Sequence, residues 1–175
     1  MMTPEQKAQV IIFTKRAIAE KYGKEINLLI ETGTYFGDMI AAQLGSFEGI
    51  ISIELSPDYY NKASERFKND TKVILLQGES PAVLAKLLPD IKVPILFWLD
   101  AHWCGGATFG DPNKYPIIEE LEAIFAQPDY ANKYFILIDD LDWMGKYLDG
   151  IKALAEKNNY VMTNENTIIK LMPAI

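Results

Sequence analysis

The sequence has one cysteine, Cys104, and one histidine, His102, among its 175 residues. A single cysteine excludes an internal disulfide and a metal site built from several cysteines, and it permits a reducing compartment. The longest apolar runs, 93–99 and 134–138, are far shorter than the roughly 20 residues that a membrane-spanning helix needs. Because the N-terminus also lacks a signal-peptide pattern, we expect no membrane partner and a cytoplasmic location.

Positive charge is also scarce in this chain. The 17 Lys and Arg residues face 24 Asp and Glu residues, which gives a net charge of −7. The basic residues are spread along helical stretches rather than clustered, so we expect no nucleic-acid partner. The length and the hydrophobic share of 49% suit one domain with a real core. We therefore predict a single domain over residues 1–175, in which residues 1–23 form an N-terminal helix that could cap a site.

The stretch from Leu28 to Gly37 combines a short apolar strand, an acid and two glycines. Glu31 stands at the expected carboxyl end of the strand, and Gly33 and Gly37 follow before a helix-compatible run. In open α/β sheets, ligands bind at the carboxyl ends of strands, and glycine lets the backbone approach a ligand closely. A carboxylate at Glu31 repels a pyrophosphate, so the turn suits a ligand that carries positive charge.

Strands and helices alternate along the rest of the chain. Apolar runs predict further strands at 50–54, 71–76, 93–99 and 134–138, and capped helices are expected between them. The last helix is expected over 146–158, and residues 160–171 have the pattern of a hairpin with a turn at 164–166. This alternation predicts an α/β fold with a doubly wound, three-layer αβα arrangement.

Acidic or small residues follow the later strands. Glu54 ends the second strand, 17 residues after Gly37, close to the ~20-residue offset at which an acid takes ribose hydroxyls in nucleotide-binding units. The run 78–80 follows the third strand. Asp100 opens a polar loop that continues to Tyr115, and a loop of this length inside a compact domain is usually functional.

The whole pattern resembles the class I S-adenosylmethionine (SAM) dependent methyltransferases. Residues 31–37 match the acid-x-Gly-x-x-x-Gly form of their SAM loop, with Tyr35 where the richer form has a third glycine. The terminal hairpin distinguishes this family from plain nucleotide-binding domains. The resemblance covers nearly the whole chain and implies a mostly parallel seven-stranded sheet with a C-terminal antiparallel hairpin.

The resemblance also implies where SAM would bind. Glu31, Gly33 and Thr34 would surround its methionine part, and Glu54 would take the two ribose hydroxyls. The run 78–80 would flank the adenine. SAM carries a sulfonium and an ammonium, so anionic strand ends would attract it. The residues expected to contact the cofactor are Glu31, Gly33, Thr34, Gly37, Glu54, Leu55, Gly78, Glu79, Ser80 and Asp100.

A second resemblance concerns the ends of the fourth and fifth strands. Asp100 with His102, and Asp139 with Asp140, resemble the acidic pairs of metal-dependent O-methyltransferases that act on small molecules such as macrolide sugars. These four residues could hold Mg²⁺ or another divalent cation, and Asp100 or His102 could remove the acceptor's proton. The alternatives are that the two adjacent aspartates only cap a turn, and that the histidine is an ordinary loop residue.

Three functions remain open from the sequence. The first is an enzyme that transfers a methyl group from SAM to a small-molecule acceptor, at a hydroxyl that could belong to a sugar. The second is an NAD-dependent oxidoreductase, which the missing Gly-x-Gly-x-x-Gly spacing and Glu31 disfavour. The third is a non-catalytic domain that binds SAM or a nucleotide. Few residues are spare for a substrate cap, so a second copy of the chain in a homo-oligomer could complete the pocket.

Overall fold

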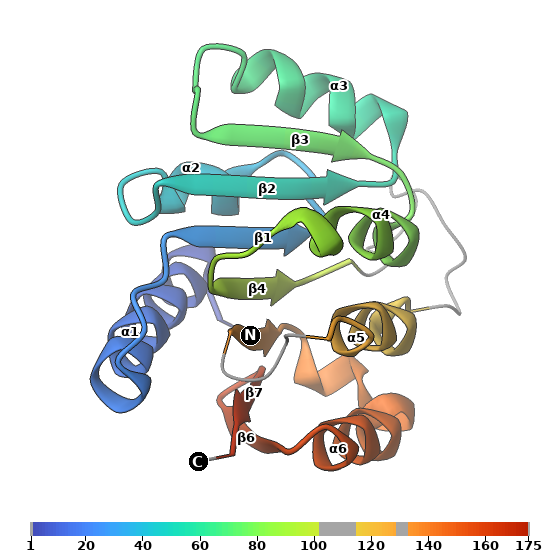
Figure 1. Cartoon of the computed structure of the whole chain (residues 1–175). Helices are drawn as coiled ribbons and strands as arrows, with labels where there is room; N and C mark the ends of the chain where they lie inside the picture. Colours follow the sequence, from blue (N-terminus) through green and yellow to red (C-terminus); the bar gives the residue numbers. More distant parts are fainter. Residues whose placement is uncertain (1, 102–114, 129–132, 175) are drawn as a thin grey trace.

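The computed structural model describes residues 2–101, 115–128 and 133–174, within which seven strands form one sheet (Figure 1). Its order is β3-β2-β1-β4-β5-β7-β6. Strands β1 to β5 pair in parallel, and β7 pairs antiparallel with β5 and β6, as predicted. The bounds are β1 (Leu28–Thr32), β2 (Gly49–Glu54), β3 (Val73–Gln77), β4 (Ile95–Leu99), β5 (Tyr134–Ile138), β6 (Tyr160–Glu165) and β7 (Ile168–Pro173).

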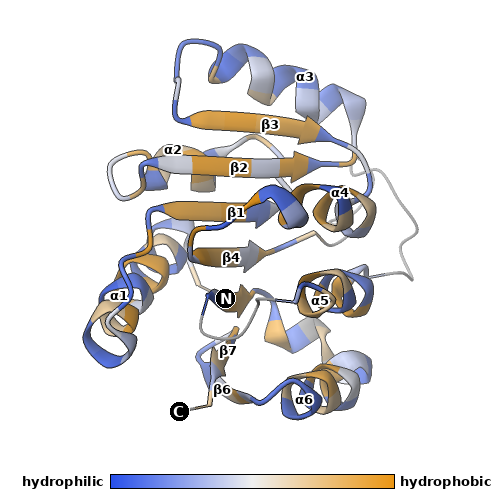
Figure 2. Ribbon diagram, viewed as in Figure 1, coloured by the Kyte–Doolittle hydropathy of each residue, from blue (hydrophilic) through white to orange (hydrophobic). Residues whose placement is uncertain are grey.

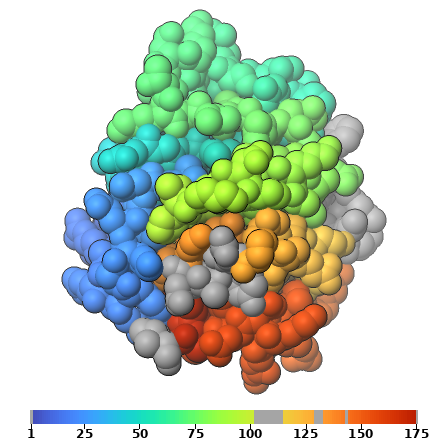
Figure 3. Space-filling view, in the orientation of Figure 1, coloured from blue at the N-terminus to red at the C-terminus, as the bar shows by residue number. Residues whose placement is uncertain are grey.

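In the part of the chain that the structure describes, three α-helices pack on each face of the sheet. One hydrophobic core lies under α1 (Pro4–Tyr22), α2 (Asp38–Gln43) and α3 (Pro57–Arg66), and the other under α4 (Ser80–Leu87), α5 (Ile117–Phe125) and α6 (Leu148–Lys157). Figure 3 shows α4, α5 and α6 side by side over the second face. The short 3₁₀ turns are η1 (Leu88–Asp90), η2 (Leu141–Trp143) and η3 (Gly145–Tyr147).

The central strands are buried on both faces. Every residue of β4 and β5 is buried, and neighbouring residues such as Phe97 and Trp98 enter opposite cores. Figure 2 shows hydrophobic colours along the strands and hydrophilic colours over much of α3. This burial explains why the runs 95–99 and 134–138 are continuously apolar instead of alternating, whereas Val93, which lies before β4, is exposed.

Local signals at the helix ends agree with the sequence. Thr3 caps α1, its side chain accepts from the backbone of Gln6, and the Gln6 side chain accepts in return from Thr3. Gly23 closes the helix with φ +61°, a left-handed conformation that glycine adopts without a steric penalty. The cap fixes the residue at which α1 begins, and the positions of the side chains along the helix follow from it.

Two predicted boundaries in the C-terminal third differ from the structure. The last α-helix begins at Leu148 rather than at 146, because residues 145–147 form the 3₁₀ turn η3 directly before it. The hairpin turn is tighter than the predicted 164–166, since Glu165 still pairs with Ile168 across the strands. Asn166 adopts φ +54° in this turn, a conformation that asparagine tolerates well. Among the described residues, every helix is too short or too polar to cross a bilayer.

Candidate cofactor and cation site

The predicted acids lie along one edge of the sheet, where β1, β2, β4 and β5 end. Backbone hydrogen bonds continue beyond the strands and align these ends. The Asp100 N–H donates to Thr32 O at 3.1 Å, and the Asp139 N–H donates to Leu99 O at 3.0 Å. Residues after neighbouring parallel strands are thereby held next to one another, as the sequence predicted.

The turn after β1 approaches the end of β4 so closely that a side chain would not fit. Gly33 has φ +85°, and a Cβ there would lie 2.4 Å from the carbonyl oxygen of Asp100. Gly37 has φ +79°, and its Cβ would lie 2.4 Å from the ring of Phe67. Tyr35 also has positive φ, +51°, at the position where the richer SAM loop has a third glycine. The loop therefore keeps the glycine-type backbone at all three positions, at a cost of about 1 kcal/mol for the tyrosine.

Glu31 is buried within a chain of hydroxyl groups. The Ser52 hydroxyl donates to Glu31 Oε2, and Thr34 Oγ1 lies 2.6 Å from Ser52 Oγ. Burial raises the pKa of Glu31 to about 8. The hydrogen bond from Ser52 acts to lower this pKa, whereas the negative charges of Asp100 and Glu54 raise it further. Glu31 is therefore mostly protonated at pH 7 until a cation comes near. Ser52 was not among the predicted site residues, although it is a lone polar residue within the apolar run of β2.

Two backbone amides hold the carboxylate of Glu54. The Tyr35 N–H donates to Oε2 at 2.9 Å, and the Ser56 N–H donates to Oε1 at 2.8 Å. Each oxygen keeps a second lone pair, so the carboxylate can still accept two hydroxyl groups. The Gly78 N–H donates to the carbonyl oxygen of Glu54 at 2.9 Å, so the turn after β3 lies beside the end of β2. The half-buried Leu55 follows directly.

The first residue of α4 contacts a buried acid that the sequence patterns had not singled out. The Ser80 hydroxyl donates to Oε1 of Glu120 on α5, whereas the predicted cofactor residue Glu79 is exposed. Burial raises the pKa of Glu120 to about 7, although the hydrogen bond from Ser80 works against it. Helical spacing could have found Glu120, because it lies three residues after Ile117 and four before Ile124, on the buried stripe of α5.

A small pocket joins Glu120 to the end of β4. The Tyr115 N–H donates to the Tyr147 hydroxyl at 3.1 Å and so fixes one side of the pocket to η3. Its lining residues are Leu99, Asp100, Ala101, Tyr115, Pro116, Ile117, Glu120 and Met144.

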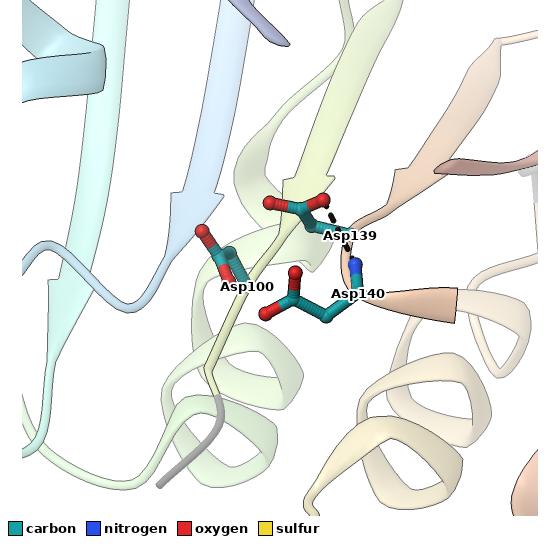
Figure 4. A group of neighbouring side chains, drawn as sticks. All are labelled: Asp100, Asp139 and Asp140. Atoms are coloured by element: carbon teal, nitrogen blue, oxygen red, sulfur yellow. Dashed lines mark hydrogen bonds between the residues drawn. The ribbon is translucent and has the colours of Figure 1, made fainter. Parts of the chain in front are cut away.

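Three aspartates converge between the ends of β4 and β5 (Figure 4). One oxygen from each of Asp100, Asp139 and Asp140 lies within 4.8 Å of the others. The Asp140 N–H donates to Asp139 Oδ1 at 2.8 Å, and Asp140 adopts φ +59°. The next residue, Leu141, donates its N–H to Thr167 O at 2.8 Å, so the C-terminal hairpin supports this strained turn. Three carboxylate oxygens at this separation fit a hard divalent cation such as Mg²⁺ or Mn²⁺.

The N-terminal helix adds a cation that the sequence analysis did not predict. The Lys7 ammonium contacts Asp139 Oδ2 and lies 3.5 Å from Asp140 Oδ1. Burial works to lower the pKa of Lys7, but the neighbouring carboxylates outweigh it and the pKa is raised. Burial and the charge of Asp100 raise the pKa of Asp139 to about 6, while Lys7 opposes that rise. Lys7 is therefore charged and forms part of the site.

The predicted roles of His102, as a catalytic residue and as a metal ligand, lie outside the described residues. Of the other predicted site residues, Glu31, Thr34, Glu54 and Asp100 gather at the edge as expected. The acidic residues Asp100, Asp139 and Asp140 come together, and their role as ligands of a cation stays a prediction. Asp139 and Asp140 also form the turn that follows β5, so a role in that turn is compatible with a cation site.

Solved structures of methyltransferases share this fold. A methyltransferase of Podospora anserina with bound S-adenosylhomocysteine (SAH) matches with a TM-score of 0.65 and 17% identity, over 99% of this chain and 80% of that one. The O-methyltransferase TomG of Streptomyces achromogenes, in complex with SAM, gives 0.66 and 14%, over 96% and 80%. An O-methyltransferase of Bacillus cereus, in complex with SAH, gives 0.66 and 13%, over 98% and 82%. No protein-family model and no curated protein matches the sequence.

The strand order and the antiparallel end of the sheet define the fold class. The chain has the class I, Rossmann-like fold of SAM-dependent methyltransferases. Its sequence is at most 17% identical to those of the three structures, so the fold is shared while the individual site residues rest on their own geometry.

Proposed function

We propose that this protein is a SAM-dependent methyltransferase that methylates a hydroxyl group of a small molecule. One observation carries the proposal: Glu31, Gly33, Glu54 and Asp100 meet at the switch point of a sheet whose fold is shared with solved methyltransferases. Ligands of open α/β sheets bind at such a point. The acids there suit the ammonium and sulfonium of SAM better than the phosphates of NAD, and the SAM and SAH complexes of proteins with the same fold support this choice.

The residues around the SAM loop have separate roles in this proposal. Glu54 is preorganised by two backbone amides to accept the ribose hydroxyls. Gly33 leaves room for the ligand beside the end of β4. Glu31 is neutral when no cation is near and ionises beside an ammonium group, which avoids an unpaired buried charge in the free protein.

The acceptor would bind next to the three aspartates. Asp100, Asp139 and Asp140 would hold a divalent cation, because their oxygens fit that ligand chemistry. When bound, SAM supplies an electrophilic methyl group and the cation lowers the pKa of an acceptor hydroxyl. Asp100 also borders the pocket that Glu120 lines, and in this proposal it accepts the hydroxyl proton.

Calorimetric titration tests the cofactor. The protein is titrated with SAM, with SAH and with NAD, each with and without Mg²⁺. We expect micromolar binding of SAM and SAH and no binding of NAD. Binding of NAD alone would favour the oxidoreductase. Binding of SAM without methylation of any hydroxyl acceptor in a library would favour the non-catalytic alternative.

A further inference from the structure

The ammonium of Lys7 lies where a divalent cation would have to bind. We propose that Lys7 is a built-in counter-ion of the three-aspartate cluster, and that a divalent cation binds there only by displacing the Lys7 side chain. This inference rests on the proposed cation site and concerns its control. The cluster differs from an ordinary group of acids, because the Lys7 ammonium already contacts two of its carboxylates.

The competition concerns a particular oxygen atom. Asp139 Oδ1 already accepts the Asp140 N–H, and Asp139 Oδ2 contacts the Lys7 ammonium. The ammonium also lies 3.5 Å from Asp140 Oδ1. A cation held by these aspartates would therefore share oxygens with Lys7, and two positive charges on one carboxylate repel each other strongly where water is largely excluded. The Asp139 side chain is 0% exposed and that of Lys7 only 16%.

Helix α1 makes the displacement of Lys7 a local step. Side chains of a helix lean toward its N-terminus, so Lys7 reaches back toward the capped end of α1 and meets Asp139 there. The rest of α1 is held independently: Ile11 and Ile18 are buried in one core, and the Tyr22 hydroxyl donates to Pro173 O at 2.9 Å. The long, flexible Lys7 side chain can therefore leave the aspartates while the helix stays in place.

The test compares Mn²⁺ affinity among three proteins, measured by electron paramagnetic resonance of free Mn²⁺. The variants are Lys7→Gln and, as the control, Arg16→Gln, which removes one positive charge from an exposed position of the same helix. We expect Lys7→Gln to bind Mn²⁺ at least about tenfold more tightly than the wild type, because a competing cation is gone. Arg16→Gln should stay within about twofold, since exposed charges are screened.

A second readout detects the displacement itself in the wild-type protein. An activated ester acetylates lysines, and mass spectrometry compares Lys7 with the exposed Lys86 on α4. We expect Mn²⁺ to increase the labelling of Lys7 several-fold and to leave that of Lys86 unchanged. A purely electrostatic effect of Lys7 would change the affinity without exposing the side chain. This readout does not depend on whether the Lys7→Gln protein folds, and Lys7→Met serves as a second variant.

The outcomes separate this inference from the proposed function. Equal Mn²⁺ affinity in the wild type and in both Lys7 variants, or labelling that Mn²⁺ does not change, overturns the role of Lys7 and leaves the cation site standing. Absence of Mn²⁺ binding in all of these proteins overturns the cation site and the role of Lys7 together. Neither result affects the assignment of SAM, which calorimetry tests separately.

Discussion

At the residue scale, the site depends on carboxylates in very different surroundings. Glu54 is held by two amide donors, whereas Glu31 has a hydroxyl partner and lies near two other acids. Amide donors stabilise a charged carboxylate, and burial beside like charges stabilises the neutral acid. The two acids of the SAM loop should therefore respond to the ligand in different ways.

The first prediction concerns protons released when SAM binds. Because the pKa of Glu31 is about 8, the group is mostly protonated at pH 7, and the ammonium of SAM should cause it to ionise. We expect release of about one proton per SAM at pH 7. Calorimetry in phosphate and in Tris measures this, since the two buffers differ in ionisation enthalpy. In Glu31→Gln the buffer dependence should vanish, and equal heats in both buffers for the wild type would contradict the assignment.

The second prediction concerns Glu54. Replacing it by Gln keeps the shape but removes the charge and one acceptor oxygen, so we expect SAM to bind more weakly by about 1.5 to 3 kcal/mol, as for hydrogen bonds to a charged group. The control is Glu20→Gln at an exposed position of α1, which should not change the affinity. Affinity of Glu54→Gln equal to that of the wild type would show that the ribose is not held there.

At the scale of elements, the strand-to-helix turns bring these residues together. The turn after β1 packs against the end of β4 at Gly33, and the tight turn after β5 is supported by the hairpin through Leu141 and Thr167. Such contacts depend on backbone conformations that most residues adopt only with strain.

The third prediction compares two glycines. Gly33→Ala should destabilise the protein by about 2 kcal/mol or more, because its φ is +85° and its Cβ would meet the Asp100 backbone. Gly45→Ala should be nearly neutral, since Gly45 does not have positive φ and a Cβ there has open space. Urea unfolding of both variants measures the difference. Equal stabilities would mean that the turn after β1 does not approach β4 as closely as described.

At the scale of the whole molecule, buried acids link stability to pH. The pKa values of Glu31 and Glu120 are raised to about 8 and about 7 from an ordinary value of 4.5. The folded state therefore binds more protons than the unfolded state between these values, and stability falls as pH rises. Their contribution is fully present below about pH 4.5 and is lost as pH rises through 7 and 8.

The fourth prediction isolates Glu120. A Glu120→Gln variant lacks this titration, so its stability relative to the wild type should increase between about pH 5 and pH 8. The rise of the pKa from 4.5 to about 7 corresponds to a total change on the order of 3 kcal/mol, most of which falls between pH 5 and pH 8. Urea unfolding at several pH values measures it, with the exposed Glu122→Gln as the control. A stability difference that does not vary with pH would mean that Glu120 is not buried as a neutral acid.

The sequence by itself determined the alternation of strands and helices, the glycine turn and the acids at the strand ends. These features depend on local properties: hydrophobic runs, capping residues and turn residues act within a few positions of one another. The mostly parallel seven-stranded sheet with an antiparallel hairpin followed from the family resemblance and agrees with the structure. Local patterns also located Glu31, Glu54, Asp100, Asp139 and Asp140, since the carboxyl ends of parallel strands meet at one edge.

The tertiary structure alone decided which side chains from different elements meet at that edge. Ser80 and Glu120 lie 40 residues apart, and Ser52 and Glu31 lie 21 apart, yet each pair shares a hydrogen bond. Lys7 meets Asp139 only because α1 packs on one face with its capped end against the end of β5. Such contacts depend on how the layers stack and on how far each helix extends, and no local pattern contains that information.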